Sequence, residues 1–230
     1  MKILHISGAK GWGGNEQQMI YCYNLDIKFF ESKCKKLNKF KNYIYLRSIV
    51  NEFKPNIIHL HTSDSLTFFT LSDLFFHLKV KAVFSKKGMG SSSSFLSKLK
   101  YNYKGITSIV CVSNTVKRDL SKILNIKAKN KTIVIHDCIS LDILNLTPTL
   151  DLRETYKIDS GFKIVGNIAN HSNAKDLPTL INVVDEVVNK QNRKDIKFIQ
   201  IGEFTKKTTE LKQLVKDKGL ENAIIFSDKI

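Results

Sequence analysis

The sequence is poor in proline and has no long apolar run. Three prolines and a hydrophobic content of 42% indicate an ordinary folded protein rather than a disordered or fibrous chain. The most apolar stretch, residues 66–78, is interrupted by Ser72, Asp73 and His77 and is too short to span a bilayer. We therefore expect a packed protein without a transmembrane anchor.

The four cysteines also lack a pattern that would assign them a chemistry. Cys22, Cys34, Cys111 and Cys138 show neither a CxxC pair nor the spacing of metal ligands, which predicts reduced thiols. Cys111 lies inside an apolar run and is expected in the core. The opening residues, MKILHIS, lack the apolar segment and small residues of a signal peptide, so we predict a cytoplasmic location.

Basic residues outnumber acidic ones, 37 to 21, which gives a formal net charge of +16. This excess predicts an anionic partner, such as nucleotide phosphates, nucleic acid or an acidic lipid surface. Coding bias toward lysine is the alternative explanation. No recognition helix or aromatic and basic RNA motif accompanies the lysines, so we expect no nucleic-acid partner. Peripheral contact with the anionic inner face of a membrane stays open.

Short apolar runs alternate with segments of helical period, which predicts an α/β fold with parallel sheets. The expected strands of the first half are 2–7, 56–61, 81–85, 108–112 and 132–136. The expected helices lie near 15–23, 42–53, 65–78, 92–103 and 114–125, and residues 24–41 form a weak stretch without alternation.

A second β/α series follows a stretch that has no clear period. We predict a first Rossmann-like domain over 1–145, a linker over 146–160 that holds a short helix, and a second domain over 161–230. The second series has strands at 163–169, 196–202 and 223–226 and helices at 176–190 and 208–218. Because doubly wound sheets usually have about five or six strands, we expect two Rossmann-like units of which the second is incomplete.

The first candidate site is the glycine-rich loop 8–15, between the first predicted strand and a helix that opens with Glu16. Glycines such as Gly13 and Gly14 let the backbone approach a ligand, and free helix amides can meet a phosphate or a sugar hydroxyl. The loop is neither a dinucleotide fingerprint, because no acidic residue ends a second strand about 20 positions on, nor a P-loop, because no GK[ST] closes it. A plain flexible turn is the alternative.

The second candidate site is the end of the strand 56–61, where α/β sheets place ligands. Alternation puts His59 and His61 on the same side of this strand. For His59 a buried, hydrogen-bonded histidine is the plainer interpretation, and His61 at the strand end is the better catalytic candidate. Two histidines without further ligands do not make a metal site, so none is expected.

The third candidate site follows the first strand of the second series. Lys175 precedes a predicted helix, where an ammonium beside unpaired helix amides suits a diphosphate. The alternative is an ordinary capped helix start, with Asn173 or Asp176 as the cap. Gly202, at the end of the next strand, would admit a planar base or a ribose.

Taken in order, these segments resemble the family 4 glycosyltransferases of the GT-B fold, which transfer a sugar from a nucleotide-diphosphate donor. MKILHIS followed by GGNEQQM resembles the family's first strand and glycine pair, and KPNIIHLH is similar to its Pro-Asp-hydrophobic-His-x-His strand. VCVSNTVKRDL and TIVIHDCISLD resemble later segments of its first domain. Residues 163–188 look like the opening of the donor domain, and residues 197–226 like the strand, helix and strand that follow.

The resemblance implies roles for five residues. His61 is implied as catalytic, and Gly13, Gly14, Lys175 and Gly202 as donor-binding. It implies no metal or flavin, a nucleotide-diphosphate sugar as co-substrate, and retention of anomeric configuration. The implied acceptor is a hydroxyl of a glycan or a lipid-linked acceptor in cell-surface polysaccharide or lipopolysaccharide synthesis.

Two positions depart from the family pattern. Asn167 stands where the family usually has an arginine that pairs with the lysine on the diphosphate, and we place it in the donor site. Lys86 and Lys87 follow the third strand, where a histidine often lies near the donor sugar, and we expect them to supply positive charge to the acceptor or the reacting groups.

The family's Glu-x7-Glu segment, which holds the donor sugar and ribose, lies beyond the last residue, Ile230. Losing one preorganised contact of this kind costs about 10²–10³ in rate, so we expect little or no transfer by this chain alone. The alternative to an enzyme is a non-catalytic truncated or degenerate product that retains a nucleotide-binding cleft.

Overall fold

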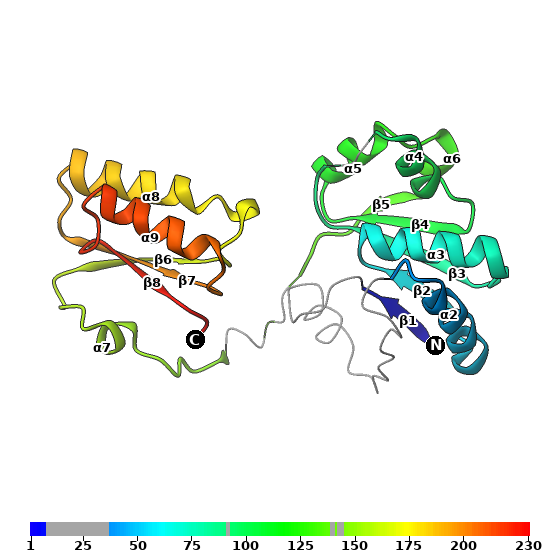
Figure 1. Ribbon diagram of the computed structural model, residues 1–230, viewed down its shortest axis with the longest axis horizontal. Helices are drawn as coiled ribbons and strands as arrows, with labels where there is room; N and C mark the ends of the chain where they lie inside the picture. The colour runs from blue at the N-terminus through cyan, green and yellow to red at the C-terminus, as the bar shows by residue number, and fades with distance from the viewer. Residues whose placement is uncertain (8–36, 91–92, 139–140, 142–144) are drawn as a thin grey trace. The chain divides into compact units, whose positions relative to one another are not determined.

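The computed structural model describes residues 1–7, 37–90, 93–138, 141 and 145–230. It divides the chain into two compact units, Met1–Leu144 and Asn145–Ile230. Each unit holds a parallel sheet with helices packed against it (Figure 1). The α/β class predicted from the alternation of apolar periods is therefore confirmed. The predicted helix 15–23 and most of the weak stretch 24–41 lie outside the described residues.

Within the described residues, the first unit has five parallel strands that pair in chain order. They are β1 (Ile3–Ile6), β2 (Ile57–Leu60), β3 (Lys81–Lys86), β4 (Ile106–Cys111) and β5 (Thr132–Val134). Each of them overlaps a predicted strand. The agreement follows from the alternating burial along the strands, since inward residues such as Ile58 and Leu60 are fully buried.

The described helices of the first unit connect successive strands. They are α2 (Phe40–Phe53), α3 (Ser63–Phe76), α4 (Phe95–Tyr101), α5 (Asn114–Ser121) and α6 (Ile126–Asn130). Helix α2 packs on α3, and α3 packs on α4. Because parallel crossovers are right-handed and the strands follow chain order, these helices share one face of the sheet. Cys111 is fully buried in the core on that face, as predicted.

Local capping explains where these helices begin. The Thr62 hydroxyl accepts a hydrogen bond from the amide of Ser65, and the Ser65 hydroxyl accepts one from the amide of Thr62, which fixes Thr62, the residue after His61, as the N-cap of α3. The predicted helix 114–125 ends earlier than expected, because α5 stops at Ser121. A separate helix, α6, begins just after the predicted range, where the Asn125 side chain accepts from the amide of Ala128.

The second unit has three parallel strands in the order β6-β7-β8. They are β6 (Lys163–Ile168), β7 (Ile196–Ile201) and β8 (Ile224–Ser227), and the helices are α7 (Leu152–Tyr156), α8 (Leu177–Asp185) and α9 (Lys207–Asp217). Helix α8 continues into a wider π-helical turn, η3 (Glu186–Lys190). Helices α8 and α9 lie on one face of the sheet, and α7 lies on its other side (Figure 1). Leu177, Ile181, Val184 and Leu220 form the center of this core.

Residues 151–162 are held within the second unit. Asp151 caps α7 by accepting from the amides of Arg153 and Glu154. The Arg153 guanidinium donates to the carbonyl oxygens of Asp159 and Phe162 at 2.9 and 2.8 Å. The short helix predicted before the second series is thus present. Among the helices described in both units, none has the length and apolar content needed to cross a membrane.

Candidate functional site

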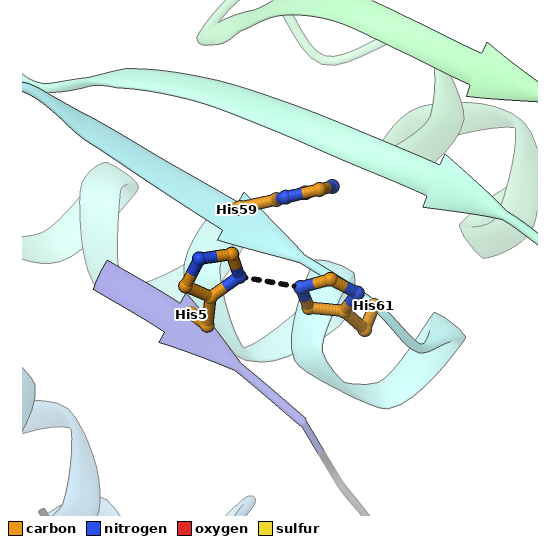
Figure 2. Close-up of side chains that lie close together, drawn as sticks. All are labelled: His5, His59 and His61. Carbon is orange, nitrogen blue, oxygen red and sulfur yellow. Dashed lines mark hydrogen bonds between the residues drawn. The ribbon is translucent and has the colours of Figure 1, made fainter. Parts of the chain in front are cut away.

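Three histidines meet at the carboxyl end of the first two strands. In the parallel register of β1 and β2, His5 lies directly beside His59, and His61 follows β2 by one position. Figure 2 shows the His5 and His61 rings facing each other with His59 beside them. The ring centroids of His59 and His61 are 4.1 Å apart, so the prediction that these two side chains share one side of the strand is confirmed.

Hydrogen bonds orient the three imidazole rings. The Nδ1 atom of His5 lies 2.8 Å from Nε2 of His61, and Nε2 of His59 lies 2.7 Å from the hydroxyl oxygen of Ser85 on β3. His59 is therefore half-buried and hydrogen-bonded, as its plainer interpretation expected. The Nδ1 atom of His61 is buried and has no hydrogen-bond partner among the described residues.

Burial keeps this cluster uncharged. It lowers the pKa of His5, it lowers that of His59 to about 4 with help from His5 and Lys87, and it lowers that of His61 to about 2 with help from its two neighbours and Lys87. Only 7% of His61 is exposed. A neutral imidazole offers one N–H donor and one nitrogen acceptor, so the cluster can hydrogen-bond a hydroxyl group or bind a metal ion.

The remaining predicted residues of the first unit divide into two groups. Lys86 ends β3, and Lys87 follows it near enough to the histidines to lower the pKa of His59 and His61. Lys87 therefore places positive charge beside the cluster. Lys86 has the same strand parity as the buried Phe84, on the helix-covered face, and its charge lowers the pKa of Lys100 on α4. Gly13 and Gly14 lie outside the described residues, so their donor-binding role stays a prediction.

The predicted donor residues of the second unit lie at the carboxyl ends of β6 and β7. The side-chain amide of Asn167 donates to the side-chain oxygen of Gln200, and Gln200 in turn donates to the carbonyl oxygen of Ala169 at 2.6 Å. Asn167 is thus engaged inside the unit. Gly202 packs so closely on the loop after β6 that a Cβ atom there would lie 2.0 Å from the carbonyl oxygen of Ala169. That close approach is why only glycine fits at this position.

Lys175 closes a 3₁₀ turn, η2 (Asn173–Lys175), and is exposed at the start of α8. The side chain of Asp176 makes no capping bond to the backbone of α8, so the capped-start alternative lacks the expected bond. The loop that carries Lys175 is anchored through His171, whose Nδ1 lies 2.8 Å from the Thr208 hydroxyl and whose carbonyl accepts from Thr205 at 2.6 Å.

A hollow of about 340 Å³ lies beside this loop, between the starts of α8 and α9. Its lining includes His171, Asn173, Asp176 and Lys207. Lysine, amide and carboxylate groups therefore border it, which suits a polar ligand.

Sequence reasoning missed His5, Ser85 and His171 as members of these clusters. A signal for His5 was present, because the predicted strands 2–7 and 56–61 each place a histidine on the face opposite their buried isoleucine and leucine residues. Ser85 and His171 had no comparable signal, since their partners come from other strands and helices.

The family model described as Glycosyltransferase Family 4 matches residues 5–143. The chain belongs to Glycosyltransferase Family 4. The matched range of this family 4 chain includes His5, His59, His61, Lys86 and Lys87. A search of the curated proteins gives no match.

Solved glycosyltransferase structures share the fold of this family 4 chain. HepE of Anabaena, crystallised with UDP and glucose, has 14% identity and a TM-score of 0.78, over 100% of this chain and 70% of its own length. A glycosyltransferase of Rickettsia africae has 19% identity and a TM-score of 0.67, over 95% of this chain and 58% of its own. The lipopolysaccharide outer core galactosyltransferase WaaB has 13% identity and a TM-score of 0.63, over 100% of this chain and 68% of its own length. The predicted GT-B fold is confirmed.

Acid should destabilise the first unit through His61. An unfolded imidazole titrates near pH 6.5, whereas folded His61 stays neutral far below that, so between these values the unfolded state binds a proton that the folded state does not. Stability is then lost as the pH falls, by up to about 1.4 kcal/mol per pH unit. We measure the free energy of unfolding by denaturant titration at pH 7 and at pH 5 and compare the loss between the two. We expect this loss to be about 2 kcal/mol smaller in His61→Gln than in the parent. The exposed-histidine variant His136→Gln should follow the parent, and equal losses in parent and His61→Gln would contradict a neutral His61.

Gly202→Ala should destabilise the second unit. Its new methyl group would overlap backbone atoms of Ala169, which cannot rotate away, so we expect a loss of about 1–3 kcal/mol or more in denaturant unfolding. Gly166→Ala is the matched control, because a Cβ atom there meets no heavy atom within 4 Å. Equal stabilities of the two variants would show that the backbone approach at Gly202 is not a constraint.

Proposed function

We propose that the protein transfers a sugar from a nucleotide-diphosphate sugar to a hydroxyl of a glycan or lipid-linked acceptor, in the synthesis of a cell-surface polysaccharide or lipopolysaccharide. The family match over residues 5–143 carries this proposal. Two similar structures support its details: HepE was also crystallised with UDP-glucose, and WaaB is described as a lipopolysaccharide outer core galactosyltransferase.

In this proposal His61 acts as a neutral hydrogen-bonding group at the reacting sugar. Its Nε2 is held by His5, and its buried Nδ1 is the ring nitrogen whose hydrogen-bonding capacity is unused among the described residues. Such a group acts without first losing a proton, because burial keeps it uncharged. Lys87 supplies positive charge beside the histidines.

Lys175 would hold the donor diphosphate in the second unit. Its loop is fixed by the bonds of His171 to Thr205 and Thr208, so the ammonium is presented by a positioned backbone. A compact ammonium stabilises the negative charge that grows on a leaving diphosphate. The Asn167 amide, which is already bonded to Gln200, supports the strand next to this loop, and Gly202 allows that loop to pack. No metal ion or organic cofactor is needed for these contacts.

We further propose that the protein works in the cytoplasm, at the inner face of a membrane where lipid-linked acceptors lie. Helix α4 supports this placement, because Phe95, Leu96 and Leu99 are 74%, 75% and 54% exposed. The same short helix carries Lys98, which is exposed. Exposed apolar side chains beside a lysine suit the surface of an anionic bilayer.

Donor binding tests the proposed function. UDP and UDP-glucose should each raise the unfolding temperature of the parent protein in a thermal-shift titration, since a ligand of the folded state stabilises it. Lys175→Gln should need about tenfold more ligand to reach the same temperature shift. A tenfold loss of affinity corresponds to about 1.4 kcal/mol of binding free energy. The matched control Lys163→Gln changes another exposed lysine of the same unit and should leave the shift unchanged.

A transfer assay separates the enzyme from a binding protein. With UDP-glucose and a glycan acceptor, release of UDP that depends on the acceptor supports the proposal, and His61→Gln should reduce it. Binding of UDP without any release would favour the non-catalytic alternative. A parent protein that neither binds nucleotide sugars nor releases UDP would refute both.

Membrane contact has its own test. The double variant Phe95→Ser, Leu96→Ser should lose most of its co-sedimentation with vesicles that contain anionic lipid, because it removes the exposed apolar surface of α4. Leu141→Ser, Leu146→Ser is the control, because it removes two leucines that are 76% and 70% exposed elsewhere. Equal binding by all three proteins, or no binding by the parent, would count against contact through α4.

A further inference from the structure

We propose that His5, His59 and His61 form a binding site for one divalent transition-metal ion of the zinc class. One ring nitrogen from each histidine lies within 4.8 Å of the other two, so rotation of the side chains can bring all three to a single ion (Figure 2). The proposal goes beyond the transferase function, which requires no metal. The sequence offered two histidines on one strand, and the third ligand comes from β1 through the parallel register.

The ligand set indicates which ions fit. Neutral imidazole nitrogen is a ligand for zinc, copper, nickel and cobalt, whereas calcium and magnesium prefer oxygen. Three histidines leave the fourth tetrahedral position of zinc open to water or to an oxygen of a bound molecule. The cluster therefore resembles an open site rather than a closed structural one.

The side chains must rotate to accept the ion. Two nitrogens bound to zinc at about 2.0–2.1 Å in a tetrahedron lie about 3.3 Å apart. The facing nitrogens of His5 and His61 are 2.8 Å apart and must separate slightly, and His59 must bring its nitrogen from within 4.8 Å of them to that distance. Nε2 of His59 bonds to Ser85, and a ligand histidine commonly uses its second nitrogen in this way to fix its ring.

Two further observations bear on affinity. His61 faces His5 through Nε2, and its second nitrogen, the buried Nδ1, has no partner among the described residues that would orient the ring, unlike the second nitrogen of His59. Lys87 also weakens the site, because its positive charge acts on both His59 and His61 and repels a cation. The site should therefore tighten when that charge is removed.

Cobalt(II) is the probe for this site, because tetrahedral cobalt absorbs visible light more strongly than octahedral cobalt. We expect the full chain to bind one equivalent of cobalt(II) with a tetrahedral spectrum, and zinc(II) to displace it. His5→Gln, His59→Gln and His61→Gln should each weaken binding by at least ~10–100-fold. His77→Asn and His136→Gln change histidines outside the cluster and should bind as the parent does.

Two milder variants keep the test decisive if a histidine variant fails to fold. Ser85→Ala removes the bond that orients His59 and should weaken binding by about tenfold. Lys87→Gln should strengthen it. An octahedral spectrum, a thiolate-to-cobalt charge-transfer band, or affinities that are the same in the parent and in both variants would overturn the proposal.

The cobalt titration tests the metal site independently of the transferase function. The titration uses the metal ion alone, with no nucleotide or sugar, so a protein that binds cobalt but not UDP-glucose would retain the metal site and lose the proposed reaction. The reverse outcome would retain the reaction and exclude the site.

Discussion

The described part of the first unit depends on one constraint, the burial of one face of its sheet under helices α2 to α6. Residues such as Ile58, Leu60 and Phe84 are buried on that face, so alternate residues must lie on the other. Parallel pairing of β1 and β2 in phase then brings His5 beside His59, with His61 one position past the strand end. The same apolar packing that stabilises the sheet thus also assembles its polar cluster.

Desolvation gives that cluster its chemical character. Imidazoles that lose water cannot easily carry charge, so His59 and His61 remain neutral and take hydrogen-bond partners inside the protein, Ser85 for His59 and His5 for His61. A buried polar group that is only partly satisfied is costly unless function requires it. Hydrogen bonding to a sugar hydroxyl and coordination of a metal ion are two ways in which these nitrogens can be satisfied.

In the second unit, internal hydrogen bonds fix the loop after β6, which carries the exposed Lys175. Gln200 is fully buried and bonds to Asn167 and to the backbone of Ala169, while His171 links the same loop to Thr208. The side chains of Gln200, Asn167 and His171 therefore form hydrogen bonds inside the unit, whereas Lys175 remains exposed. The loops that follow β6 and β7 lie at the same edge of the three-stranded sheet, because parallel strands end on the same side.

The sequence by itself determined the α/β class and the position of each described strand, because apolar periods act over a few neighbouring positions. The order of its motifs gave the resemblance to family 4, which the family match over residues 5–143 confirms. From the same local alternation, the sequence predicted that His59 and His61 share a side. Only the tertiary structure decided that His5 joins them and that Ser85 holds His59, since contacts between strands that lie 26 or more residues apart in the chain are not a local property. Likewise, the need for glycine at position 202 comes from the backbone of Ala169 on a neighbouring strand end, which no local pattern reveals.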